Sequence, residues 1–337
     1  MDKPFHEQIT VGDRTYLSLA RVRLKELAVL AGFKAHRLAE IEIIISEISS
    51  NLSKHAKDGG YILCRIGNDP SQPFIEFIAI DQGPGIITPK KVMKDGISTK
   101  KTLGHGLGAI KRLSTEFDFY SQPGWGTILF SRNHTPQKNG TIRLQAEFLR
   151  TAKKGELACG DNWYFKTNGK TCQIAVIDGL GHGPEASAAA IESVRIISNS
   201  RAETPEQQLR SIHDGIKRTR GVVMTVFHIN TNNRQASYCG VGNISSRIIS
   251  KIADTRGKSC TPYNGILGHS LPNTIGNNFT FLDPKQDQLI IHSDGISSRW
   301  EMGKYIGIQK HHPMILCAAI YKDHIRGNDD ATVAVLR

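Results

Sequence analysis

Four aspartates in the second half of the chain lie where an apolar strand ends or begins, or in a turn. They are Asp161 in CGDNW, Asp178 in VIDGLGHG, Asp294 in HSDGISS and Asp329 in GNDDATVAVL. Clustered carboxylates raise one another's pKa unless a cation neutralises them, and oxygen ligands select Mg²⁺ or Mn²⁺ over zinc. Two such ions about 3.5–4 Å apart can activate a water and clamp a phosphoryl group, and Gly179 leaves its carbonyl within reach of a metal. One Asp-Gly pair alone is usually a turn, but four acids in this order predict a metal site.

A second set of residues that could carry out chemistry lies in the first half of the chain. Glu47 and Asn51 are spaced i, i+4 in an amphipathic stretch, so both side chains leave one face of the predicted helix. Asn can supply an oxygen ligand to Mg²⁺, and Glu can orient or deprotonate a nucleophile. Asp81 ends the apolar run FIEFIAI and can accept from the exocyclic amine of adenine, while Gly83 and Gly85 let backbone approach the base. The alternatives are a solvated polar stripe on the helix and a simple β-turn.

Glycines and hydroxyls complete this first constellation. Gly104, Gly106 and Gly108 open a predicted helix in GHGLGAIKRL, whose N-terminal N–H groups and dipole would hold phosphate. The basic stretch TPKKVMKDGISTKKTL (88–103) is predicted to be a mobile lid over the phosphates, or else an exposed basic loop. In GWGTI, Thr127 begins a strand. Each pattern is weak alone, and their order along the chain carries the prediction.

The elements that must position these residues predict two domains in the 337-residue chain. Two amphipathic helices, over residues 14–33 and 36–57, precede a meander of strands, which predicts an α/β sandwich for residues 1–133. Residues 134–141 are polar, contain Pro and Gly, and are the predicted linker. Many short strands and two helices follow, so residues 142–337 are predicted to form a β-rich core with helices packed on it. The fold class is α+β.

Composition limits the classes of function. The net charge is +12, but the basic excess is spread over both halves: Lys and Arg number 18 against 14 acids in residues 1–133, and 25 against 17 in residues 134–337. No long basic run or nucleic-acid motif is present, so we expect no nucleic acid as a partner. Six scattered cysteines without a C-x-x-C pair indicate reduced, mostly buried thiols. Without an apolar signal core or a run long enough to cross a membrane, the chain is expected to be cytoplasmic, with no membrane partner.

The first half resembles the Bergerat ATP-binding fold of the GHKL superfamily over about residues 8–131. SEISSNLSKHA, DQGPGI and GHGLGAIKRLSTEFDFYSQPGWGT are most similar to RsbT-type serine/threonine kinases, and next to anti-sigma kinases. The resemblance implies ATP and Mg²⁺ as cofactors, Glu47 as general base, Asn51 as Mg²⁺ ligand and Asp81 as adenine reader. It further implies that Thr127 supports the adenine contact and that Gly104, Gly106 and Gly108 form the phosphate cradle. No dimerisation helix with a phosphoacceptor His precedes the fold, which argues against a sensor histidine kinase.

The second half resembles SpoIIE-type, metal-dependent serine/threonine phosphatases of the PPM superfamily, RsbX-like ones above all. GDNW, DGLGHGPEAS, SDGIS and NDDATVAVL match block by block over about residues 142–337, which implies a PPM-type αββα sandwich holding two Mn²⁺ or Mg²⁺ ions. By this resemblance Asp178 is the bridging ligand, with Gly179 beside it. Asp294 and Asp329 complete the coordination of one metal ion, and Asp161 belongs to the second coordination shell or binds the second metal ion. A metal-bound hydroxide is the implied nucleophile, so no Ser or Cys nucleophile is needed.

Three hypotheses of function follow. The first is a bifunctional switch enzyme whose two halves add and remove phosphate on a Ser or Thr of a STAS-domain partner, as in stressosome or anti-anti-sigma proteins. The second is a phosphatase regulated by a non-catalytic ATP-binding module, against which the intact Glu47 and Asn51 argue. The third is an anti-sigma module that sequesters a sigma factor, against which the RsbT-like GAIKRL block argues mildly.

Overall fold

The computed structural model describes residues 4–11, 14–56, 60–67, 74–88, 106–134, 144–251 and 257–337. Most of the predicted linker and of the predicted basic lid lies outside these residues. The chain divides into two compact units. One consists of His6–Gly140 with Ile306–Ala318, and the other of Met1–Phe5, Thr141–Tyr305 and Ala319–Arg337.

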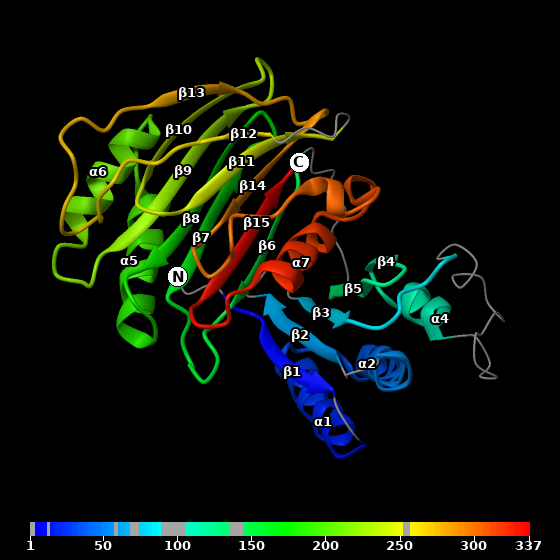
Figure 1. Ribbon diagram of the computed structural model, residues 1–337. Coiled ribbons are helices and arrows are strands. Elements are labelled where there is room, and N and C mark those ends of the chain that lie inside the picture. The colour runs from blue at the N-terminus through cyan, green and yellow to red at the C-terminus, as the bar shows by residue number, and fades with distance from the viewer. Residues whose placement is uncertain are drawn as a thin grey trace. The chain divides into compact units, whose positions relative to one another are not determined.

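The first unit is built on one five-stranded antiparallel sheet with the strand order β1-β2-β3-β5-β4 (Figure 1). Its helices contact the sheet from one side, and both helices predicted at the start of the chain are confirmed. The elements are β1 (Glu7–Val11), α1 (Arg14–Leu30), α2 (Ala35–His55), β2 (Gly60–Gly67), β3 (Phe74–Asp81), α4 (Gly106–Leu113), β4 (Glu116–Gln122) and β5 (Gly126–His134).

Helix α2 positions the first candidate site because its apolar residues recur every three or four positions. Ile41, Ile45 and Ile48 are buried on the face that meets the sheet. Alternate strand residues such as Ile62 and Cys64 of β2 meet them in one core, as the period of a strand requires. The predicted α/β sandwich of the first half is therefore confirmed.

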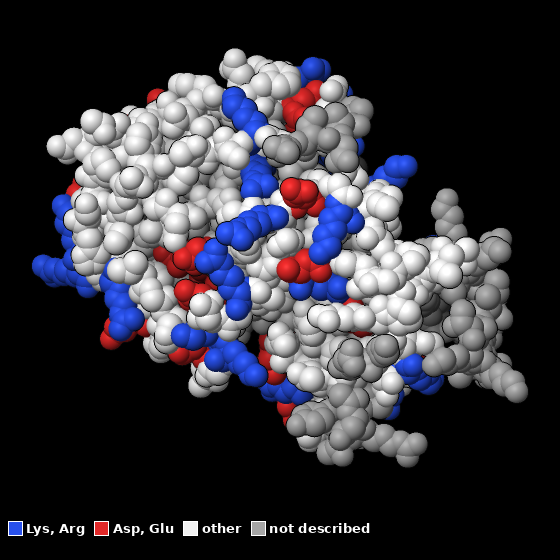
Figure 2. Space-filling model, viewed as in Figure 1, with Lys and Arg blue, Asp and Glu red and all other residues white. Residues whose placement is uncertain are grey.

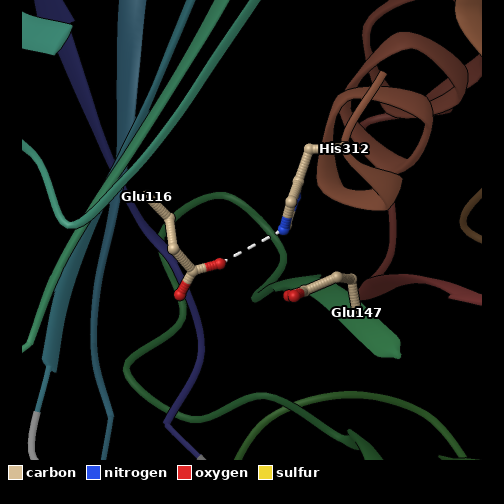
Figure 3. A group of neighbouring side chains, drawn as sticks. All are labelled: Glu116, Glu147 and His312. Carbon is tan, nitrogen blue, oxygen red and sulfur yellow. Dashed lines mark ion pairs between the residues drawn. The ribbon is translucent and has the colours of Figure 1, made fainter. Parts of the chain in front are cut away.

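A short segment from late in the chain also belongs to the first unit. Within Ile306–Ala318, the His311 ring lies 3.0 Å from a carboxylate oxygen of Asp118 on β4, and the His312 backbone N–H donates to the same carboxylate. Figure 3 shows the next acid along β4, Glu116, turned toward the His312 ring, 3.3 Å away. These acids are two positions apart, so both leave the same face of the strand. The sequence did not predict this placement.

The second unit contains two five-stranded antiparallel sheets, with the orders β13-β10-β9-β8-β7 and β12-β11-β14-β15-β6 (Figure 1). Its elements are β6 (Ala146–Thr151), β7 (Asp161–Thr167), β8 (Thr171–Gly179), α5 (Pro184–Asn199), α6 (Pro205–Gly215), β9 (Val222–Asn230), β10 (Gln235–Val241), β11 (Ser245–Ser250), β12 (Lys258–Ser259), β13 (Asn278–Phe281), β14 (Asp287–His292), the second half of α7 (Pro313–His324), and β15 (Ala331–Leu336).

Two hydrophobic cores hold the second unit together. One fills the space between the sheets with side chains such as Ile174, Phe227 and Ile291. The other lies between the first sheet and helices α5 and α6. Helix α6 begins at Pro205, and its N-cap Thr204 makes a reciprocal capping box with Gln207. The Thr204–Pro205 pair predicts this helix start from the sequence alone. The predicted fold class, an α/β sandwich followed by a sandwich of two sheets, is confirmed.

Three bulk expectations can be compared with the structure. All six cysteines lie in the described part of the chain; they are buried and form no disulfide, as expected. Among the described residues, no helix combines the length and the apolar character that crossing a membrane requires. On the face drawn in Figure 2, Lys and Arg side chains lie among Asp and Glu side chains.

Candidate functional site

The first candidate site is organised by one face of α2. Glu47, Asn51 and His55 follow one another at steps of one turn. The first residue of α4, Gly106, lies against the first two: a Cβ there would be 2.6 Å from the Glu47 Oε2 and 3.7 Å from the Asn51 Oδ1. The structure therefore brings the predicted base, the predicted Mg²⁺ ligand and the start of the predicted phosphate-binding helix together. Gly108 lies on the same helix and is buried.

The end of β3 meets the last turn of α2. A Cβ on Gly83 would be 2.6 Å from the carbonyl oxygen of His55, so Asp81 and Asn51 belong to one neighbourhood. The Asp81 Oδ1 accepts from the Gly83 N–H at 2.7 Å, which fixes the carboxylate at the strand end. Gly85 has a φ of +70°, and a Cβ there would collide with the Gln122 carbonyl oxygen at 1.8 Å. Only glycine fits this turn.

The β4–β5 turn lies at the same strand end. A Cβ on Gly126 would be 2.3 Å from the Asp81 carbonyl oxygen, and the Thr127 hydroxyl lies 3.0 Å from that of Ser121. Ser121 also accepts from the Ile86 N–H at 2.9 Å, so it ties the DQGPGI loop to this turn. Ser121 could not be predicted as part of this site, because a serine within a strand carries no signal of its own. Gly104 lies outside the described residues.

The second candidate site lies at strand ends of the second unit. Asp161 starts β7 and Asp178 stands near the end of β8, and the two residues face each other directly in the antiparallel ladder. The Gly179 N–H donates to the Gly160 carbonyl at 3.1 Å. The first turn of α5 packs closely on both glycines, since a Cβ on Gly179 would be 2.3 Å from the Ala186 carbonyl oxygen. These glycines thus let a helix start come close to two acids.

Asp294 and Asp329 reach the same neighbourhood from the other sheet. They follow β14 and precede β15, two strands that pair with each other. Burial raises the pKa of Asp178, and the charges of Asp161, Asp294, Asp329 and Asp330 raise it further. All four predicted acids therefore interact, together with Asp330. No three of these five carboxylates have oxygens all within 4.8 Å of one another, a separation that mutual repulsion favours.

Hydrogen bonds that the sequence did not predict hold the acids in place. The Asn243 amide donates to the Asp294 Oδ2 at 2.8 Å, and the Ser293 hydroxyl donates to the Asp161 Oδ2 at 2.6 Å. The Asp330 carboxylate accepts from the backbone N–H groups of Lys153 and Gly160, both at 2.8 Å. Both oxygens of the Asp330 carboxylate are thereby used to hold the backbone at Lys153 and Gly160. Ser293 links the two sheets, because its own hydroxyl accepts from the N–H of Thr332.

These residues fit divalent ions of the Mg²⁺ or Mn²⁺ kind. The side chain of Asp161 is buried, and its Oδ1 has no hydrogen-bond donor among the described residues. A buried oxygen without a partner is costly, and a cation would satisfy it. The donor set consists of carboxylate oxygens, which hard cations prefer. Asp161, Asp178, Asp294 and Asp329 would be the ligands.

Binding of Mn²⁺ to this cluster is expected to depend steeply on pH. Burial raises the pKa of Asp161 to about 7, and the charge of Asp330 contributes. Below that pH a metal must displace a proton, so the apparent affinity should fall roughly tenfold per pH unit for one displaced proton. Calorimetric titration with Mn²⁺ at several pH values between about 5.5 and 8 measures this. An affinity that stays constant over that range contradicts the raised pKa.

Two known protein families match the chain, one in each half. Residues 11–131 match the histidine kinase-like ATPase domain, which covers the site around Glu47 and Asp81. Residues 168–337, half of the chain, match stage II sporulation protein E, and the chain belongs to this SpoIIE family. The predicted resemblance of both halves is confirmed.

Two relatives from Bacillus subtilis (strain 168) divide the chain between them. Phosphoserine phosphatase RsbX is 29% identical over 154 residues, which are 46% of this chain and 75% of RsbX. Serine/threonine-protein kinase RsbT is 39% identical over 108 residues, which are 32% of this chain and 80% of RsbT. The protein therefore joins a kinase-like and a phosphatase-like domain related to these two proteins.

Solved structures agree with this division. A structure from a study of the bacterial stressosome, "a modular system that has been adapted to control secondary messenger signaling", superposes with a TM-score of 0.53 at 27% identity, covering 58% of this chain and all of that one. RsbX in complex with magnesium gives a TM-score of 0.52 at 24% identity, covering 59% of this chain and 98% of RsbX. The second likeness shows the fold alone.

Proposed function

We propose that the protein is a bifunctional signalling switch that removes phosphate from, and adds phosphate to, a Ser or Thr of a partner protein. Two observations carry the phosphatase half. The charges of Asp161, Asp294 and Asp329 all act on Asp178. In addition, a buried carboxylate oxygen of Asp161 has no donor among the described residues. The kinase half is supported by Glu47 and Asn51 beside the start of α4. RsbX and RsbT, which carry the two activities in their names, support the pairing.

In the phosphatase half, Asp161, Asp178, Asp294 and Asp329 would hold two Mn²⁺ or Mg²⁺ ions, with Gly179 beside them. When bound, the ions would polarise a water and the phosphoryl oxygens. Asp178 can serve both ions because it faces Asp161 across the ladder and interacts with the other acids. Hydrogen bonds from Ser293 to Asp161 and from Asn243 to Asp294 hold these two carboxylates in their orientations.

In the kinase half, Asn51 would bind the Mg²⁺ of ATP and Glu47 would accept the proton of the attacking hydroxyl. Asp81 would accept from the adenine amine, with Thr127, Gly83 and Gly85 around it. Gly106 and Gly108, with Gly104 before them, would present the N-terminal N–H groups of α4 to the phosphates. The short steps from Glu47 to Asn51 and on to His55 and Gly83 support one continuous nucleotide site.

The partner we propose is a STAS-domain protein of a stressosome or anti-anti-sigma system, within a network that controls a sigma factor. RsbX, RsbT and the stressosome structure are the support for this class of partner.

The test uses the full chain with candidate STAS-domain proteins. We expect the protein to label a Ser or Thr of the partner when it is given radiolabelled ATP and Mg²⁺. After the ATP has been removed, addition of Mn²⁺ should cause the protein to release the label from the partner. Chelation by EDTA should stop removal.

Two results would replace this proposal. Removal without any labelling would indicate a phosphatase regulated by a non-catalytic ATP-binding module. Recovery of a sigma factor, rather than a STAS-domain protein, from a pull-down would indicate an anti-sigma factor.

A further inference from the structure

A phosphate group that enters the second candidate site meets an excess of negative charge. Five ionised carboxylates with two divalent ions would leave one net negative charge, and a phosphoserine would bring about −1.5 to −2 more. A cation beside the acids would relieve this repulsion and orient the phosphate. The inference below rests on the proposed phosphatase function and concerns which residue supplies that cation.

Arg326 is held beside the acids by backbone pairing. Its N–H donates to the Gly295 carbonyl at 2.9 Å, directly after Asp294 in the chain, and Ile325 forms an antiparallel bridge with Ile296. Arg326 also precedes Asp329 by only three residues. Two of the proposed metal ligands therefore flank it, one through this pairing and one along the chain.

The junction around Gly295 is closely packed. A Cβ on Gly295 would be 1.9 Å from the Asp330 carbonyl oxygen, so glycine is required for the two segments to pack. The Ser297 N–H adds a bond of 2.8 Å to the His324 carbonyl. The backbone that carries Arg326 is thus hydrogen-bonded to the segment that directly follows Asp294.

Arg326 is also available to a substrate. Its side chain is exposed and forms no ion pair with any residue of the described chain. Burial and the charge of Asp329 raise the pKa of Asp294, while the positive charge of Arg326 opposes that rise, so the guanidinium acts on the acids.

Two other arginines near the acids are already engaged. Arg150, whose charge acts on Asp161, is fully buried and donates to the Cys159 carbonyl. Arg220 lies near Gly181 but pairs with Glu185. Neither can meet an incoming phosphate without giving up a contact.

We propose that Arg326 binds the phosphoryl oxygens of the phosphoserine or phosphothreonine substrate. Its guanidinium supplies two parallel donors that match the spacing of phosphate oxygens, and its charge offsets the excess negative charge of the loaded site.

The test measures inorganic phosphate binding to the Mn²⁺-loaded full chain by calorimetry, beside phosphate inhibition of partner dephosphorylation. Loss of a charge-assisted contact is expected to weaken phosphate binding roughly 10- to 100-fold in Arg326→Ala. Arg326→Lys, which keeps the charge and loses the paired donors, should lie between Arg326→Ala and wild type. The Mn²⁺ affinity should not fall, because the variant removes a positive charge.

Arg299→Ala is the matched control, since Arg299 is also exposed and follows Asp294 by five residues. It should change phosphate affinity by less than about twofold. The inference is overturned if Arg326→Ala binds phosphate as wild type does, if Arg299→Ala loses as much, or if the wild-type protein with Mn²⁺ does not bind phosphate. Absence of partner dephosphorylation together with Arg326-dependent phosphate binding would instead contradict the proposed function and support this site.

Discussion

Replacing Asp178 by asparagine is expected to abolish Mn²⁺-dependent dephosphorylation and to leave ATP binding unchanged. Asparagine has nearly the same shape, but it removes the charge of the residue that faces Asp161 and interacts with the other acids. Loss of a residue that hydrogen-bonds to a metal ligand already lowers metal affinity or activity roughly 10- to 100-fold. Loss of the ligand itself should therefore lower them further. Turnover of the phosphorylated partner and calorimetric titration with Mn²⁺ measure the effect.

A second readout separates this result from misfolding. Burial and four neighbouring carboxylates raise the pKa of Asp178, so the metal-free wild type carries unfavourable repulsion at neutral pH. The metal-free variant should therefore melt at a higher temperature than metal-free wild type. Asp214→Asn, at an exposed position on α6, is the control and should change neither property. Loss of ATP binding together with turnover in Asp178→Asn would contradict two independent sites.

Replacing Glu47 by alanine is expected to stop phosphate transfer to the partner while ATP still binds. Removal of a general base costs typically 10²–10⁴-fold. Because the Glu47 carboxylate lies against Gly106, Glu47→Gln is the better-packed companion variant and should show the same loss. Labelling of the partner measures transfer, and fluorescence of a labelled nucleotide measures binding.

The matched control for this prediction lies on the same helix. Glu42→Gln alters an exposed acid that pairs with Lys25, and a surface pair contributes little. It should transfer phosphate at the wild-type rate. Undiminished transfer by both Glu47 variants would show that the base is another residue.

Elements with local patterns could be predicted from the order of residues alone. The period of apolar residues defined α2, because one face of that helix is buried and the other exposed. Strand ends marked by an acid and glycine located Asp81 and Asp178. The Thr204–Pro205 pair predicted the start of α6, which the structure places at Pro205.

Two of the elements that were not predicted show why local patterns can fail. In α7 every residue from Met314 to Tyr321 is buried, so no polar face reveals a helix. Strand β13 is short, and its Phe279 and Phe281 are exposed, which reverses the usual cue for a buried strand face.

Which acids meet, and which residues support them, depends on how the sheets pack. Asp161 lies opposite Asp178 because of strand register, and Ser293 reaches Asp161 from another sheet, 132 residues away in the chain. The sequence could not indicate that the Asp330 carboxylate holds the backbone at Gly160 while Arg326 remains exposed beside Asp294. Local patterns report burial and turns, whereas these roles depend on contacts between distant segments, which form only when the sheets pack.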